Sequence, residues 1–203
     1  QRLDYGRSEF DNRHRVVVAY VYGLPFGRGK RFGGNMNRAV DAIVGGWQLG
    51  GVATFQKGFP FSVTAPDPGG ILNAFSQRAN LVPGCDPNGG SKSITHWFNT
   101  SCFTAPLAGA FGNSGRNILT QPGINNWDMN LGKTFTITER VAFQFRAEAF
   151  NVFNHTQYGV NQLTGGAASS VANNVANTAV VPFGAIQSAR PARIMQLGGK
   201  IVF

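Results

Sequence analysis

The sequence predicts an all-β protein whose long antiparallel strands alternate in the manner of membrane strands. Two observations lead to this prediction. Charged residues make up only 13% of the 203 residues, yet no stretch approaches the roughly 18 consecutive apolar residues of a membrane-spanning helix. Instead, apolar and polar residues alternate with the period of two that is typical of a strand. The alternating segments are roughly 13–24, 45–57, 126–137, 140–153 and 193–203.

In the second, third and fourth segments one parity is apolar and the other is polar, and in the first segment one parity forms an apolar face. The apolar faces are formed by Val16, Val18, Tyr20 and Tyr22; by Trp47, Leu49, Ala53 and Phe55; by Trp127, Met129, Leu131, Phe135 and Ile137; and by Val141, Phe143, Phe145, Ala147, Ala149 and Phe153. The polar faces include Gln48, Thr54, Gln56, Asn126, Asp128, Asn130, Thr134, Thr136, Gln144, Arg146 and Glu148. Arg146 and Glu148 are two residues apart, so we expect them to share a face and to pair.

The fifth segment is the C-terminal tail, whose last eight residues are QLGGKIVF. A polar residue, a glycine two places on, and apolar residues at the third-last and last positions are typical of the closing strand of a bacterial outer-membrane β-barrel. Leu197, Ile201 and Phe203 share one parity and are expected to face lipid. The other parity is expected to face the barrel interior, and its members are Gln196, Gly198, Lys200 and Val202.

Alternation alone does not separate a membrane barrel from a soluble β-sandwich. The predicted strands are about ten residues or longer, close to the ~9–11 residues that cross a bilayer, whereas globular strands average ~5–6. The connections also alternate in length, because the turn at 138–139 is minimal while 58–125 and 154–192 are long. Outer-membrane barrels have short periplasmic turns and long outer loops. We therefore predict an antiparallel transmembrane β-barrel segment with two long extracellular loops.

Two features fit this prediction less well. The 25–44 connection falls on the periplasmic side but is longer than expected there. Lys133 has the parity of the lipid-facing side chains, and we expect it to snorkel to the headgroups. In addition, five strands do not close a barrel, because single-chain bacterial barrels have an even number, about eight or more. The chain is therefore predicted to be the C-terminal piece of a larger barrel, or to assemble with other chains.

No motif predicts catalysis, and we expect neither an enzyme nor a cofactor. The glycine-rich segment 27–32 lacks the spacing of a dinucleotide-binding or phosphate-binding loop. His14, His96 and His155 lie in different segments without the spacing of metal ligands. The net charge of +9 invites a nucleic-acid interpretation. The basic residues are scattered, however, and the one cluster, at 28–31, lacks stacking aromatics, so no nucleic-acid partner is expected.

The long polar segment 58–125 contains both cysteines and several candidate binding residues. A disulfide between Cys85 and Cys102 would suit an oxidising compartment. Long ordered loops usually carry function, and a loop that only caps the barrel is the equally weighted alternative. The candidate ligand-contacting residues are Arg78, Asn80, Trp97 and Arg116.

Several blocks resemble the C-terminal barrel of TonB-dependent outer-membrane receptors. The blocks are LPFGRGKRF at 24–32, GGWQL at 45–49, GFPF at 58–61, FGNSGRN at 111–117, RAEAFNVFNH at 146–155, and the tail. The resemblance is greatest to the Oar-like branch, which carries a carboxypeptidase-regulatory-like domain and is of Acidobacteria type. It covers nearly the whole chain.

The resemblance implies the last five strands of an about 22-stranded barrel in the outer membrane of a Gram-negative bacterium. It implies TonB-driven uptake of a small-molecule ligand such as an iron chelate (siderophore), or of a saccharide or peptide. The expected partners are membrane lipid, the upstream barrel and plug, and TonB through an N-terminal region not among these residues. The barrel-assembly machinery is expected to recognise the tail, in particular Gln196, Gly198, Ile201 and Phe203. Two alternatives stay open, an autotransporter or adhesin barrel and a secreted carbohydrate-binding β-sandwich.

Overall fold

The computed structural model describes residues 4–67, 69–70, 76–90, 92–158 and 182–203. The chain divides into two compact units, which we describe separately. The sheet unit comprises Val16–Phe55, Asn125–Thr156 and Pro191–Phe203. The loop unit comprises Gln1–Arg15, Gln56–Ile124 and Gln157–Arg190. Among the described residues, no helix is both long enough and apolar enough to cross a membrane.

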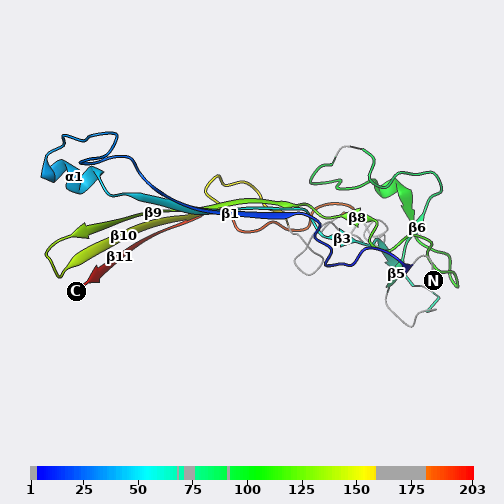
Figure 1. Cartoon of the computed structure of the whole chain (residues 1–203). Coiled ribbons are helices and arrows are strands. Elements are labelled where there is room, and N and C mark those ends of the chain that lie inside the picture. Colours follow the sequence, from blue (N-terminus) through cyan, green and yellow to red (C-terminus); the bar gives the residue numbers. More distant parts are fainter. Residues whose placement is uncertain (1–3, 68, 71–75, 91, 159–181) are drawn as a thin grey trace. The chain divides into compact units, whose positions relative to one another are not determined.

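A five-stranded sheet in the order β1-β2-β9-β10-β11 forms the sheet unit (Figure 1). Each strand lies in one of the five alternating segments of the sequence, although β9 starts two residues earlier than expected. Strands β1 and β11 are the edges, so the sheet is not a closed barrel. The strand bounds are β1 Arg15–Gly23, β2 Gln48–Gln56, β9 Ile124–Thr136, β10 Ala142–Phe150 and β11 Ile194–Val202.

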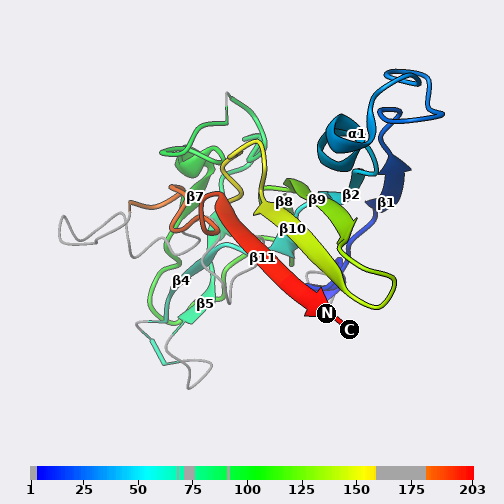
Figure 2. The same ribbon diagram turned by 90° about the vertical axis from the view of Figure 1, so that its left-hand side faces the viewer.

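Strand β10 pairs antiparallel with both β9 and β11 and lies between them (Figure 2). A short turn joins β9 to β10, where the amide of Ile137 donates to the carbonyl of Val141 at 2.9 Å. The register places Phe143 opposite both Phe135 and Ile201. Because side chains alternate along every strand, this register sorts the apolar and polar residues onto opposite faces of the sheet.

The connection between β1 and β2 contains a short helix, α1 (Arg38–Val44). Asn37 caps its N-terminus, and the Asn37 side chain accepts a hydrogen bond from the amide of Val40 at 2.8 Å. In Figure 1, α1 lies at the end of the sheet that carries the C-terminus and the β9–β10 turn. The sequence did not predict this helix, because seven residues are too few for a helical period to be visible.

The expectation that Lys133 snorkels to the headgroups is wrong. Only 6% of Lys133 is exposed. Its Nζ donates a hydrogen bond to the carbonyl of Ile43 in α1 at 3.0 Å. The same nitrogen lies 4.8 Å from the ring centre of Phe135 and 5.5 Å from that of Trp47. The ammonium group of Lys133 is therefore bound within the protein, because α1 folds back over this part of the sheet.

The segment 58–125, expected as one long loop, is largely a folded body with its own core. Three short antiparallel pairs, β3–β8, β4–β5 and β6–β7, run through it. Strands of two or three residues are too short for alternation to reveal. The bounds are β3 Pro60–Phe61, β4 Thr64–Pro66, β5 Ser76–Arg78, β6 Asn80–Leu81, β7 Phe103–Thr104 and β8 Leu119–Thr120, with a 3-10 helix η2 at Thr100–Cys102.

The core of the loop unit is built from aromatic and small apolar side chains. Phe98 is its centre, since its ring meets those of Phe61, Phe103 and Phe183 in edge-on contacts with centroids 5.3–5.8 Å apart. Phe183 comes from the second long connection, which therefore contributes to the same core. The buried members are Phe61, Val63, Ala65, Ala79, Phe98, Cys102, Phe103, Leu119 and Phe183.

A disulfide and two close backbone approaches hold this unit together. Cys85 and Cys102 are bonded, with their Cα atoms 5.4 Å apart. A Cβ added at Gly58 would lie 1.8 Å from the carbonyl oxygen of Gln121, and one at Gly112 would lie 1.8 Å from that of Arg78. Only glycine fits at these two positions, because any side chain would collide with a neighbouring backbone segment.

Candidate functional site

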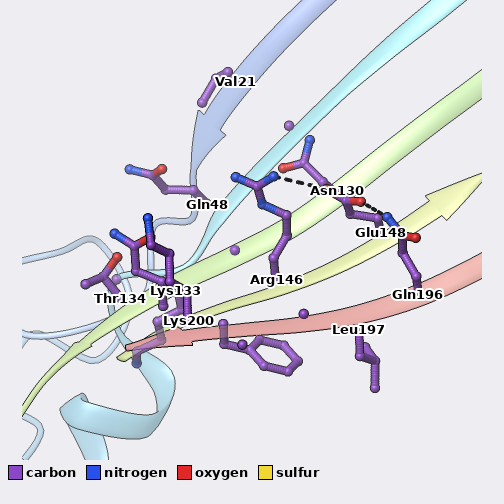
Figure 3. Close-up of a pocket in the computed structure, with 17 residues that line it drawn as sticks. Val21, Gln48, Asn130, Lys133, Thr134, Arg146, Glu148, Gln196, Leu197 and Lys200 are labelled. Carbon is purple, nitrogen blue, oxygen red and sulfur yellow. Dashed lines mark hydrogen bonds and ion pairs between the residues drawn. The ribbon is translucent and has the colours of Figure 1, made fainter. Parts of the chain in front are cut away.

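The polar face of the sheet unit forms an open trough with a volume of about 910 Å³ (Figure 3). Strands β2, β9, β10 and β11 all contribute side chains to it. In Figure 3, Arg146, Glu148 and Gln196 lie on the trough side, while Leu197 points to the other side of the sheet. The polar residues that line the trough are Gln48, Asn130, Lys133, Thr134, Gln144, Arg146, Glu148, Gln196 and Lys200.

A chain of three polar side chains crosses β10 and β11 in the trough. Arg146 Nη1 lies 3.2 Å from Glu148 Oε1, and Gln196 Nε2 donates to the other carboxylate oxygen, Oε2. The register explains the second contact, because Glu148 is directly opposite Gln196. The Arg146 side chain is 69% exposed and that of Glu148 only 21%. The guanidinium therefore keeps donor groups that are open to a ligand.

Glycines in the polar rows leave space for the trough, because they have no side chains. Gly50, Gly132 and Gly198 have the same parity as the polar side chains, and Arg146 is opposite both Gly132 and Gly198. A Cβ added at Gly50 would lie 2.9 Å from the side-chain nitrogen Nδ2 of Asn130. Larger residues at these positions would fill the trough or displace its polar side chains.

The trough supplies hydrogen-bond donors and acceptors from amides, a carboxylate, a guanidinium and an ammonium group. Among the described residues, no group of three or more His, Cys, Asp or Glu side chains is arranged to hold a metal ion. This arrangement suits the binding of a polar solute, or of the polar surface of another protein element, by hydrogen bonds and ion pairs.

The opposite face of the sheet unit is aromatic. Trp47 makes edge-on contacts with Phe135 and Phe145, with ring centres 6.3 and 5.9 Å apart. Trp127 makes edge-on contacts with Phe55 and Phe153, with ring centres 5.6 and 5.7 Å apart. Aromatic pairs of this kind contribute about 0.5–1.5 kcal/mol beyond the area that they bury. Leu197 and Ile201, on the same parity of β11, are 75% and 61% exposed.

The four candidate ligand-contacting residues of the loop unit all have partners within that unit. Two of them hold the N-terminal segment by ion pairs, and the other two hold neighbouring backbone. The contacts are Arg78 to Asp4 at 2.9 Å, Arg116 to Glu9 at 3.7 Å, the amide of Asn113 to the Asn80 side chain at 3.1 Å, and Trp97 Nε1 to the carbonyl of Thr120 at 2.8 Å. These contacts give each residue a structural role, and ligand contact stays a prediction.

Sequence reasoning missed Arg7, which has the most extensive contacts of the N-terminal segment. Its Nη2 donates to the carbonyls of Asn117 and Leu119 at 2.8 and 3.1 Å. The side-chain Nδ2 of Asn117 donates a hydrogen bond to the carbonyl of Arg7 at 2.6 Å. The positive φ of 54° at Asn117 is a conformation that asparagine tolerates better than most residues. No local pattern links positions that are 110 residues apart.

Comparison with known proteins identifies the family. The model of a family described as an outer membrane beta barrel domain matches residues 1–196, so the chain belongs to this family. Membership of the family indicates an outer-membrane location. Searches of curated proteins and of solved structures found no match.

Proposed function

We propose that the chain is the C-terminal part of a TonB-dependent receptor that takes up a ligand across the outer membrane of a Gram-negative bacterium. Family membership supports an outer-membrane barrel protein. The sequence blocks that resemble Oar-like receptors support the more specific assignment. The ligand is a small molecule such as a siderophore, or a saccharide or peptide, and the protein is not an enzyme.

The observation that carries the proposal is the two-faced sheet. One face is aromatic and aliphatic, as lipid requires. The other carries the Arg146–Glu148–Gln196 chain in an open trough, as a wet or plugged lumen requires. A plug domain supplied by the upstream region would meet this polar face, and TonB would act on that plug. The proposed orientation turns the C-terminal end of the sheet toward the periplasm, since the β9–β10 turn at that end is short and outer-membrane barrels have short periplasmic turns.

The experiment is retention of the full-length protein on TonB. Outer membranes of the native host are solubilised in detergent and passed over the immobilised periplasmic domain of TonB. We expect a heat-modifiable protein containing this sequence to be retained. Deletion of the gene should abolish energy-dependent uptake of the ligand, and screening siderophores, saccharides and peptides identifies which class is lost.

The second candidate is an autotransporter or adhesin barrel, because its last strand has the same pattern. Such a protein would not be retained on the TonB column. It would also carry a passenger domain upstream of these residues. The secreted β-sandwich loses its support, since the chain belongs to an outer-membrane barrel family. A protein that is neither retained by TonB nor required for uptake would contradict the receptor proposal.

A further inference from the structure

We propose that the connection between β1 and β2 is a lipid-binding rim that holds anionic phospholipid headgroups of the periplasmic leaflet. The rim comprises residues 25–44, including α1. This inference rests on the proposed function, which turns the aromatic face of the sheet toward lipid and its C-terminal end toward the periplasm. The inference goes beyond that function because it assigns a ligand, anionic phospholipid, to the unusually long periplasmic connection.

The first argument is where α1 is attached. The carbonyl of Ile43, in the last turn of α1, accepts hydrogen bonds from Trp47 Nε1 at 2.9 Å and from Lys133 Nζ at 3.0 Å. Carbonyls in a last turn have no partner within their own helix. Both donors belong to the aromatic face of the sheet. The helix is therefore fastened through Trp47 and Lys133 to the aromatic face of the sheet, the face that the proposed function turns toward lipid.

The second argument is that the rim exposes apolar side chains. Phe26 and Phe32 are 41% and 49% exposed, and Ile43 is 69% exposed. The two phenyl rings pack together with their centres 5.6 Å apart. Exposed aromatic and aliphatic side chains on a short amphipathic segment are typical of elements that lie in the headgroup region.

The third argument is charge. The rim carries four cationic side chains, Arg28, Lys30, Arg31 and Arg38, and one acidic residue, Asp41. Asp41 is already engaged, since its side chain accepts a hydrogen bond from the amide of Arg28 at 2.7 Å. All four cationic residues are exposed, and none of the ion pairs among the described residues involves any of them. The rim therefore carries an excess of exposed positive charge that can bind an anion from outside.

Cationic and apolar groups are also interleaved at short range. The guanidinium carbon of Arg31 lies 5.7 Å from the centre of the exposed Phe32 ring. A headgroup phosphate accepts hydrogen bonds from such a guanidinium while the neighbouring ring enters the acyl region. A nucleic acid would not reach this site, because it lies on the lipid side of the barrel wall. Anionic phospholipid is the occupant that satisfies both the charge and the apolar surface.

The test uses the full-length protein in phospholipid nanodiscs. Ile43→Cys is labelled with a fluorescent bimane, and quenching is compared between brominated phosphatidylglycerol and brominated phosphatidylcholine. The native cysteines of this chain are bonded to each other and do not react. We expect quenching by both lipids and a preference of about fivefold for the anionic one, which corresponds to about 1 kcal/mol.

Two charge variants establish whether the cations cause the preference. Replacing Arg28, Lys30 and Arg31 together by Gln should abolish the preference, so that the two brominated lipids quench the label equally. The matched control removes three exposed charges from the loop unit, Arg13→Gln, Lys57→Gln and Arg190→Gln, and should keep the preference. Equal quenching by the two lipids in the unaltered protein would overturn the proposal.

A second label separates failure of this inference from failure of the proposed function. Leu197→Cys places bimane on the exposed apolar face of β11. Quenching at 197 without quenching at 43 would refute the lipid-binding rim while leaving the barrel assignment intact. Absence of quenching at both positions would refute the membrane barrel itself.

Discussion

At the scale of single residues, Lys133 shows how an apolar strand face accommodates a charge. Burying an unpaired ammonium is costly. Here its nitrogen contacts the carbonyl of Ile43 and the rings of Trp47 and Phe135. The carbonyl is a hydrogen-bond acceptor and the ring faces attract a cation. A side chain that breaks the alternation of β9 is thus the one that anchors α1.

We predict that Lys133→Met releases α1 from the sheet. Methionine keeps the apolar volume but loses the hydrogen bond from a charged donor, which contributes about 1.5–3 kcal/mol. Amide hydrogen exchange over 38–44 should become about tenfold faster or more. Lys200→Met is the control, because Lys200 is exposed on the trough side. Unchanged exchange over 38–44 in Lys133→Met would show that the contact does not hold the helix.

The disulfide between Cys85 and Cys102 gives a second residue-scale prediction. The cysteines are separated by 17 positions, and closing a loop of this size contributes about 3 kcal/mol in the chain-entropy model. Alkylation of the native, non-reduced protein followed by mass spectrometry should find no free thiol at either position. The double variant Cys85→Ser, Cys102→Ser should make the loop unit more sensitive to proteolysis. Two alkylated cysteines in the native protein would contradict the bond.

At the scale of elements, cross-strand register turns a sequence alternation into two surfaces. Gln144 is opposite Thr134 on one side and Lys200 on the other, which makes a continuous polar row. One position along, Phe143 is opposite Phe135 and Ile201 in an apolar row. A one-residue slip of β10 would exchange these rows, so the two-sided pattern strongly specifies the register.

We predict that Phe145 and Gln144 respond very differently to substitution by arginine. Phe145→Arg places a charge on the lipid face, which costs about 2–4 kcal/mol near the bilayer midplane, and sets it opposite Lys133. Gln144→Arg leaves the charge in the trough and should cost far less. Unfolding of the full-length protein in lipid, followed by heat-modifiable migration, measures both. A greater loss for Gln144→Arg would reverse the assignment of the two faces.

The terminal strand gives a second element-scale prediction. Phe203 is 96% exposed at the end of β11, an edge strand with a free row of backbone groups. Such an edge can add to another sheet, and we propose the barrel-assembly machinery as that partner. Deleting Phe203 from the full-length protein should lower its surface level, whereas Phe203→Tyr should not. Normal surface levels of the deletion variant, measured by surface proteolysis, would refute a role in assembly.

At the scale of the whole molecule, the sheet unit exposes both of its edges and an aromatic face. Open edges and apolar faces are templates for aggregation in water. We therefore predict that this 203-residue chain, expressed alone, forms no monodisperse monomer without detergent. Size-exclusion chromatography with light scattering measures this. A sharp monomer peak in detergent-free buffer would contradict the membrane interpretation.

The sequence by itself determined the five long strands, because a period of two over many residues is a local property that neighbouring residues carry. It also determined which residues share a face, and therefore that Arg146 and Glu148 lie together. The polar trough follows from these faces together with the strand order. Only the tertiary structure decided the rest. The core around Phe98, the contacts of Arg7, and the position of α1 over Lys133 each join residues far apart in the chain, and such pairings leave no local period to recognise.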